Sequence, residues 1–296
     1  MAEMTTSTPT TSPAVNGSAV IKPWWSQMGV LFWLSVAWVV FISVGGFIAG
    51  LLPLEDPING DLDKIYRPMF SDDALLGTDS NGRDLLSRVM HGAGVSLKLA
   101  YIAPFFSLFF GLCLGISAGY FRGRVDTIIS IFIDSILAFP NIVAIIALLF
   151  YLGATPLNMI LVFSFFGIPL DTRVARANAI MFAERDFVMA ARAQGASHLR
   201  IMFRELLPNV VVPLLSLVIF HMAIIIVIDG VLSFLGVGIP PPTPTWGKMI
   251  ADGFEDISRE PQAAFVPSAA MFLTILSMNM IGDRLRQLTD VKASSV

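Results

Sequence analysis

The side chains best suited to chemistry in this sequence form two small groups of ionisable residues. The first group lies between two hydrophobic segments and comprises Asp79, Arg83, Asp84 and Arg88. Acidic and basic side chains so close together can neutralise one another through charge-assisted hydrogen bonds, which predicts a compact network. Asp79, Asn81 and Asp84 also offer oxygen ligands of the kind that calcium prefers, but the full ligand spacing of an EF-hand loop is absent. The pattern favours a structured loop over a metal site.

The second group consists of carboxylates inside hydrophobic segments, Asp134 and Asp229. A carboxylate within a bilayer is costly, so each must face a partner, a cavity or an interface. For Asp134, near the start of its segment, a structural hydrogen bond to another helix is favoured over a place in a substrate path. For Asp229 a structural bond and a polar gate remain equal alternatives. His221 lies about 80° round a helix from Asp229, so we expect it to contact a neighbouring helix instead.

Other familiar catalytic and binding patterns are absent from the sequence. It contains no Gly-x4-Gly-Lys-Ser/Thr motif for nucleotide phosphates, so we expect no cofactor on this chain. The only cysteine, Cys113, lies in an apolar run. We therefore expect Cys113 to be a small buried apolar side chain that takes part in neither a disulfide nor a metal site.

The composition places these residues in a polytopic membrane protein. Hydrophobic residues make up 55% of the 296 residues and charged residues only 14%, too few to cover a soluble globule of this size. Charge-poor segments predict an all-α fold with six transmembrane helices. The expected spans are about 28–52, 97–121, 127–152, 157–178, 208–232 and 262–283.

The remaining segments connect these spans. Residues 1–22, rich in Thr, Ser and Pro, predict a disordered tail without the features of a cleavable signal. The transmembrane domain is expected over 23–290, with a short tail at 291–296. Lysine and arginine are concentrated on the side of the N-terminus, which predicts that both termini are cytoplasmic. Residues 53–96 then form the first external loop and 179–207 a cytoplasmic loop.

The cytoplasmic loop has the sequence of a helix–turn–helix. Ala190 and Ala191 favour a helix and have almost no side chain, so another protein could approach closely. Gly195 suits the left-handed residue that ends a helix, and Ser197 can cap the next one. Leu207-Pro208 opens a long apolar run, where proline fits the first helical turn. The segment predicts a docking site, and the alternative is a generic amphipathic loop.

The spacing Ala-Ala, three residues, Gly, eleven residues, Leu-Pro resembles the "EAA loop" of permease subunits of prokaryotic ABC importers. In that family the loop is the coupling helix that docks in a cleft of the ATPase subunit. Met189 stands where the family usually has glutamate, and Glu205 where it has isoleucine. The resemblance implies that these residues form the coupling loop: Asp186, Met189, Ala190, Ala191, Gly195, Ala196, Ser197, His198, Arg200, Leu207 and Pro208.

Residues 76–97 resemble the "GTD–GRD–SR–G–SL" signature of the C-type permease subunit of peptide and nickel importers. Gly94-Val95 stands where the family often has arginine. Further similarity in 119–140 and 229–253 extends the resemblance over about residues 30–290. It implies an external signature and gate formed by Gly77, Thr78, Asp79, Gly82, Arg83, Asp84, Arg88, Asp229 and Ser233.

The resemblance implies a permease that takes di- or oligopeptides across a prokaryotic plasma membrane by alternating access. Its expected protein partners are a homologous B-type permease, with which it forms a heterodimer, and an extracytoplasmic solute-binding protein. Two ABC ATPase subunits, or a fused one, are expected to bind ATP and magnesium. The chain is expected to lie in the bilayer and to bind no nucleic acid. Nickel chelates and glutathione are alternative substrates. An ion-coupled secondary transporter is the main rival, although mid-span charges are scarce and no repeated halves are visible. A membrane scaffold without transport is a second rival.

Overall fold

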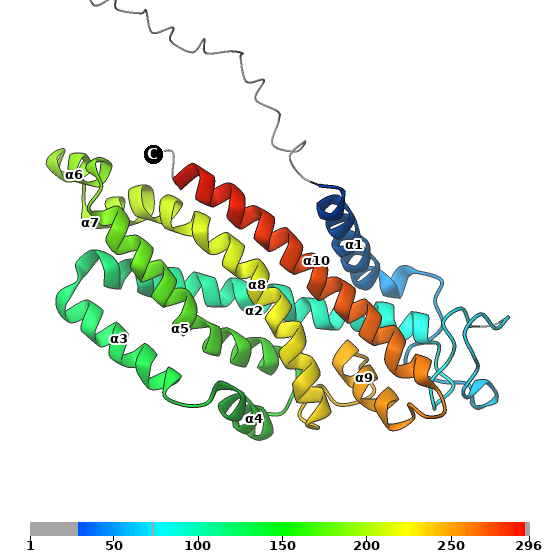
Figure 1. The fold of residues 1–296 in the computed structure, drawn as a ribbon. Coiled ribbons are helices and arrows are strands. Elements are labelled where there is room, and N and C mark those ends of the chain that lie inside the picture. Colours follow the sequence, from blue (N-terminus) through cyan, green and yellow to red (C-terminus); the bar gives the residue numbers. More distant parts are fainter. Residues whose placement is uncertain (1–28, 73, 294–296) are drawn as a thin grey trace, which may run out of the picture.

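The computed structural model describes residues 29–72 and 74–293, and the regular elements in this part of the chain are helices (Figure 1). The α-helices are α1 Val30–Phe47, α2 Leu85–Phe121, α3 Gly123–Leu137, α4 Asn141–Leu152, α5 Pro156–Ala183, α6 Asp186–Ala193, α7 His198–Arg200, α8 Leu207–Phe234, α9 Trp246–Glu255 and α10 Pro261–Ala293. Two 3₁₀ turns, η2 Ala49–Leu51 and η3 Leu62–Lys64, and one π-helical turn, η4 Ile201–Leu206, complete the set.

Five of the helices described are long and apolar enough to cross a membrane, or up to six if α3 and α4 count as one bent span. The predicted all-α, polytopic fold is therefore confirmed. The third span differs from the expected single helix over 127–152, because α3 and α4 meet at 80°. Pro140 explains the break, since it has no N–H to continue the helix and disfavours a helical residue before it.

The centre of the bundle is the close packing of α2 on α5. Gly111, Gly115 and Gly119 recur every fourth residue on α2 and face α5, where Gly115 and Gly119 meet alanines. A Cβ at Gly115 would lie 2.5 Å from the Cβ of Ala175, and one at Gly119 would lie 2.7 Å from that of Ala179. Small residues at this spacing let two membrane helices approach closely, where dispersion and backbone contacts hold them together.

The same packing exposes Cys113, against the prediction that this cysteine is buried. Each residue turns an α-helix by 100°, so Cys113 points about 200° away from Gly111 and Gly115. Those glycines face α5, and Cys113 therefore faces outward. An apolar run in a membrane sequence does not imply burial in protein, since the outer face of a span meets lipid.

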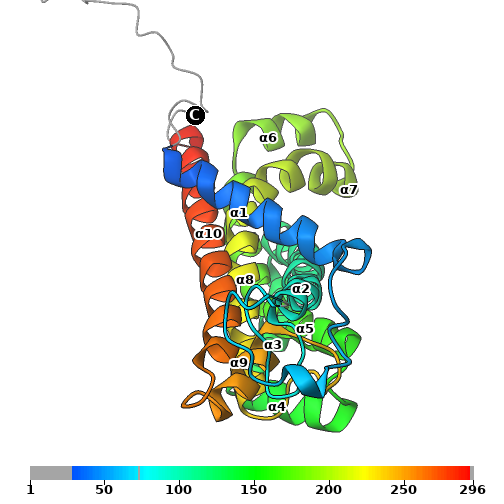
Figure 2. The ribbon, with the colours of Figure 1, turned by 90° about the vertical axis from the view of Figure 1, so that its right-hand side faces the viewer.

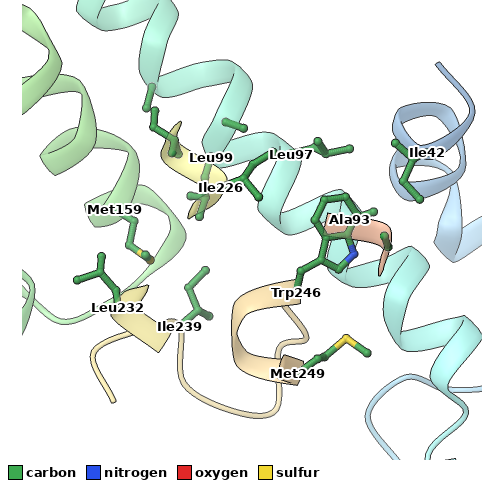
Figure 3. Close-up of a cluster of buried hydrophobic side chains, with 14 of the residues drawn as sticks. Ile42, Ala93, Leu97, Leu99, Met159, Ile226, Leu232, Ile239, Trp246 and Met249 are labelled. Carbon is green, nitrogen blue, oxygen red and sulfur yellow. The ribbon is translucent and has the colours of Figure 1, made fainter. Parts of the chain in front are cut away.

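A second cluster packs α9 against α2 and α8 (Figure 3). Trp246, at the start of α9, is fully buried, and a Cβ at Gly92 of α2 would lie 3.4 Å from its indole. Its Nε1 donates a hydrogen bond of 3.0 Å to the carbonyl of Val89. Leu232 of α8 belongs to the same cluster. A large aromatic residue whose polar atom is also satisfied fixes α9 firmly to the bundle.

Different helices and connections lie at the two ends of the bundle. In both views α6 and α7 lie at one end, and α9 and the connection between α1 and α2 lie at the other (Figures 1 and 2). The start of α1 and the end of α10 lie at the α6–α7 end. The expected tail 1–22 is outside the described residues, and α10 continues to Ala293, past the expected start of the other tail at 291.

Helix α2 begins at Leu85, so residues 85–96 are helical although they were expected in the external loop. Asp84 explains the early start, because its carboxylate accepts the N–H of Ser87 at 2.7 Å and caps the helix. The connection that remains non-helical is therefore shorter than the expected loop 53–96.

Candidate functional site

The predicted helix–turn–helix forms at one end of the bundle (Figure 2). Gly195 has a φ of +78°, as predicted for the residue that ends the first helix. The N–H groups of Gly195 and Ala196 bond the carbonyls of Arg192 and Ala191, each at 3.0 Å, which is the Schellman arrangement. Ser197 caps α7 by accepting the N–H of Arg200 at 3.4 Å, so both predicted roles are confirmed.

The second short helix joins α8 through the π-helical turn η4. Pro208 occupies the first turn of α8 and has no N–H to donate to the carbonyl four residues earlier. The N–H of Leu207 reaches back five residues to the carbonyl of Met202. The sequence therefore makes α7, η4 and α8 one continuous rod, and α6 is folded back beside its end.

The inner face of this helix pair is fixed to α2. Val188 of α6 and Ile201 of η4 are buried against Tyr120, near the end of α2. The Tyr120 hydroxyl is hydrogen-bonded to Nδ1 of His198 at 2.9 Å. The guanidinium of Arg192 lies 5.1 Å from the centre of the Tyr120 ring, within cation–π range. The loop is thus rigidly connected to a central helix.

The outer face of the pair exposes apolar side chains. Met189 is 52% exposed, Leu199 66% and Phe203 62%. Ala190 is also exposed, whereas Ala191 is half-buried and packs against the chain's own core. Exposed apolar residues gathered on one rigid element are typical of a surface that contacts another protein. We call Phe187, Met189 and Ala190 of α6, Leu199 of α7 and Phe203 of the adjoining turn η4 the outer face of α6–α7.

The other predicted coupling residues lie around this face. Asp186 is in the first turn of α6, where a carboxylate is favourable beside the helix N-terminus. Arg200 and Pro208 are exposed and Leu207 is half-buried.

At the opposite end, the predicted charge network forms around Asp79. Its Oδ2 lies 2.7 Å from Nε of Arg83 and 3.4 Å from Nε of Arg88, which is almost fully buried. Arg88 also donates to the carbonyl of Pro57 at 2.8 Å. Asp84, expected in the same network, instead caps α2 through Ser87. Burial raises the pKa of the Asp84 carboxyl in spite of that hydrogen bond.

Three neutral residues of the external signature fold the same connection. Thr78 is fully buried, donates from its hydroxyl to the carbonyl of Lys64 and accepts the N–H of Arg67 at 2.9 Å. Gly77 and Gly82 have φ angles of +82° and +70°, so both occupy left-handed turns. In the described residues no cluster of three or more His, Cys, Asp and Glu side chains fits a metal ion.

Asp229 and Ser233 lie where α8 packs against α2 and α9. Asp229 is 1% exposed and accepts a hydrogen bond of 3.4 Å from the hydroxyl of Ser96. Ser96 in turn accepts the backbone N–H of Trp246 at 3.2 Å. Ser233 is buried beside Gly238 and Gly247. The carboxylate thus links three helices.

The other ionisable residues within the spans pair between helices. Asp134 of α3 forms an ion pair of 2.6 Å with Arg173 of α5, in agreement with the predicted structural role. His221 of α8 lies 3.4 Å from Oδ1 of Asp171 on α5, so the expected contact with a neighbouring helix is present. Asp171 is a buried polar residue that the sequence pattern does not single out. It directly follows the charge-free run that ends at Leu170, and so it reads as the boundary of a span.

The fold defines a polytopic α-helical membrane protein with a short helix pair projecting from one end. A family described as "Binding-protein-dependent transport system inner membrane component" matches residues 111–294. The chain belongs to this family, and it is a permease subunit of a binding-protein-dependent ABC importer.

Relatives in other organisms agree with this assignment. The chain is 37% identical over 219 residues to the dipeptide transport system permease protein DppC of Alkalihalophilus pseudofirmus, covering 74% of this chain and 72% of the relative. It is 32% identical over 293 residues to the glutathione transport system permease protein GsiD of Pectobacterium atrosepticum, covering 96% of both. A chain of the inward-facing MetNI methionine ABC transporter is similar in fold, with a TM-score of 0.56 at 15% identity over 68% of this chain and 96% of that one.

Proposed function

We propose that this chain forms half of a path that carries di- or oligopeptides across the plasma membrane, and that the outer face of α6–α7 couples it to separate ATPase subunits. The observation that carries the coupling is the exposed apolar face on a helix pair that Tyr120 and His198 fix to α2. A force applied to that face reaches a central transmembrane helix without an intervening flexible segment. ATP hydrolysis by the partners can then drive alternating access.

The complete importer requires three further kinds of subunit. A homologous B-type permease would supply the other half of the path, two ABC ATPases or a fused one would bind ATP and magnesium, and an extracytoplasmic binding protein would deliver the cargo. This chain would have no catalytic activity of its own. The names of the relatives support the peptide cargo.

Glutathione is the second candidate cargo, because the GsiD relative matches almost the whole chain. Vesicles that contain the complete complex and its binding protein should accumulate a labelled dipeptide when ATP is inside. Labelled glutathione and a nickel chelate are measured in parallel. Accumulation that follows an ion gradient without ATP would instead support the secondary transporter, and no accumulation of any cargo would favour a scaffold.

The orientation of the chain gives a further prediction. Because α6–α7 lies at the same end as the start of α1 and the end of α10, both termini should be cytoplasmic if the ATPases dock there. In a Cys113→Ser background, a cysteine at Ser197 should react with an impermeant thiol reagent only from the cytoplasmic side. A cysteine at the exposed Asp63 should react only from outside. Labelling of Ser197→Cys from outside would refute the coupling assignment.

A further inference from the structure

A cavity of about 290 Å³ lies midway along the bundle, between α2, α5, α8 and the bent α3–α4 pair. Most of its wall is apolar, with side chains such as Ile145, Phe163 and Ile225. Ser107 and His221 bring polar atoms to this wall. A mostly apolar cavity with a few convergent polar groups is the usual form of a small-molecule site.

Behind the wall, both polar residues contact a buried carboxylate. Asp171 is fully buried, and its Oδ2 accepts a hydrogen bond from the hydroxyl of Ser107. Its Oδ1 lies 3.4 Å from Nδ1 of His221 and makes no hydrogen bond within the described residues. The absence of a side chain at Gly167 leaves room for the Ser107 hydroxyl. We call Ser107, Asp171 and His221 the Asp171 cluster.

Within the described residues no lysine or arginine pairs with this carboxylate, and His221 compensates its charge only when the imidazole is protonated. A carboxylate at this depth needs a compensating positive charge or strong donors. Arg173 lines the same cavity, but its guanidinium is paired with Asp134 at 2.6 Å. A neutral His221 can offer at most one polar contact, so a positive group that enters the cavity would complete the cluster.

We propose that the Asp171 cluster is a contact site for the protonated amine of a cargo molecule in the transmembrane path. Ser107 and His221 face the amine, and Asp171 supplies the negative charge behind them. The identity of the cargo rests on the proposed function, whereas the preference of the cavity for cations does not.

The preference for cations can be measured with charged thiol reagents. In a Cys113→Ser background, Leu170, which lines the cavity and is 47% exposed, is changed to cysteine in the assembled complex. Its reaction rates with aminoethyl and sulfonatoethyl methanethiosulfonate are divided by those of free cysteine. We expect the cationic reagent to be favoured at least about tenfold, because a local negative charge concentrates cations.

Asp171→Asn should remove this preference while keeping the shape of the side chain. Asp63→Asn, the same change at an exposed position of the 3₁₀ turn η3, is the matched control and should leave the preference unchanged. A ratio equal to that of free cysteine, an unchanged ratio in Asp171→Asn, or no reaction with either reagent would overturn the proposal. If the Asp171→Asn complex does not assemble, the ratio of the two reagent rates measured with Asp171 in place still tests the proposed preference for cations.

The kinetics of peptide uptake can distinguish a cluster that contacts the cargo from one that only holds helices together. In Asp171→Asn we expect KM for a dipeptide with a free amine to rise at least about tenfold, with kcat changed less than about twofold. A fall in kcat with unchanged KM would show that the cluster only holds helices together, and would also overturn the proposal. If the complex takes up no peptide at all, the proposed function fails, and the reagent ratio still tests the cluster.

Discussion

At the α6–α7 end the predicted docking residues are exposed apolar side chains, whereas at the α9 end the predicted signature residues include buried ionisable side chains. Phe203 and Leu199 are more than half exposed at the first end. Asp79, Arg88 and Asp229 are each less than a tenth exposed at the second. Exposed apolar surface favours contact with a partner, and buried ion pairs favour a single fixed arrangement of the chain. We infer that the outer face of α6–α7 is suited to contact with the ATPases, whereas the buried network holds the α9 end in a fixed shape on which a binding protein can dock.

The largest effect on stability is expected from breaking the buried pair at the α9 end. Asp79→Ala would leave Arg88 without its carboxylate while 3% exposed. Removing one partner of a buried ion pair costs about 3–5 kcal/mol, which should appear as a marked fall in the Tm of the purified complex.

Glu55→Ala is the matched control for this substitution. Glu55 also pairs with a basic side chain of the same connection, Lys64, at 3.0 Å, but it is 45% exposed. Solvent screens such a pair, so we expect a change of less than about 1 kcal/mol. Equal shifts in Tm for the two variants would contradict the idea that burial makes the Asp79 network important.

At the other end, a charge on the outer face should abolish coupling without unfolding the chain. Ala190 is exposed on α6, so the side chain in Ala190→Arg can extend into solvent but would obstruct a close-fitting partner. We expect ATPase binding and uptake to fall at least about tenfold, or ~1.4 kcal/mol, at an unchanged Tm. Ala190→Ser, which keeps the small size, should retain both. The half-buried Ala191 is a poorer site for this test, because arginine there would also disturb the core.

The turn between α6 and α7 offers a conformational test of the same end. A β-branched residue at Gly195 must adopt a φ of +78°, although no other atom lies near its Cβ. We expect Gly195→Val to cost roughly 1–2 kcal/mol locally and to lower transport per ATP hydrolysed severalfold. Gly195→Asn tolerates a left-handed backbone and should restore much of the activity. If both variants behave as the unsubstituted protein does, the turn has no part in coupling.

The features that the sequence predicted correctly depend on neighbouring residues. Gly195 and Ser197 could be assigned because the end of one helix and the cap of the next are set by residue types a few positions apart. The charge-free run predicts the second span only from about residue 97, because Arg88 and Lys98 interrupt the apolar sequence before it, whereas the Asp84 cap starts α2 at Leu85. Hydropathy marks the part of a helix that crosses the bilayer, and a helix can begin well before that part.

The features that the sequence missed depend on packing between distant segments. Asp171 of α5 meets Ser107 because the glycines of α2 let the two helices approach closely, and it meets His221 on a third helix, α8; no local pattern shows either meeting. The exposed Cys113 follows from the same geometry. Hydropathy shows that a segment is apolar, but it does not tell whether an apolar side chain faces lipid or another helix, because both surroundings are apolar.

The smallest effect is expected at Asp229, because its carboxylate is bonded to a neutral hydroxyl and not to a basic side chain. The sequence left open whether its carboxylate is a gate or a structural bond, and its contact with Ser96 joins α2, α8 and α9. We propose that this junction helps form the external gate.

Asp229→Asn keeps the shape and an acceptor for the Ser96 hydroxyl but removes the charge. A hydrogen bond to a charged group exceeds a neutral one by about 1 kcal/mol, so uptake should fall severalfold at most. The measurement is peptide uptake together with ATPase stimulation by loaded binding protein, and Ser96→Ala is the companion variant that removes the donor. If the charge gates the path, Asp229→Asn should lower both activities while Tm changes little. Unchanged uptake and unchanged stimulation would show that the charge has no role in gating, and Asp229 would then belong with Asp79 among the side chains that only fix the shape of this end.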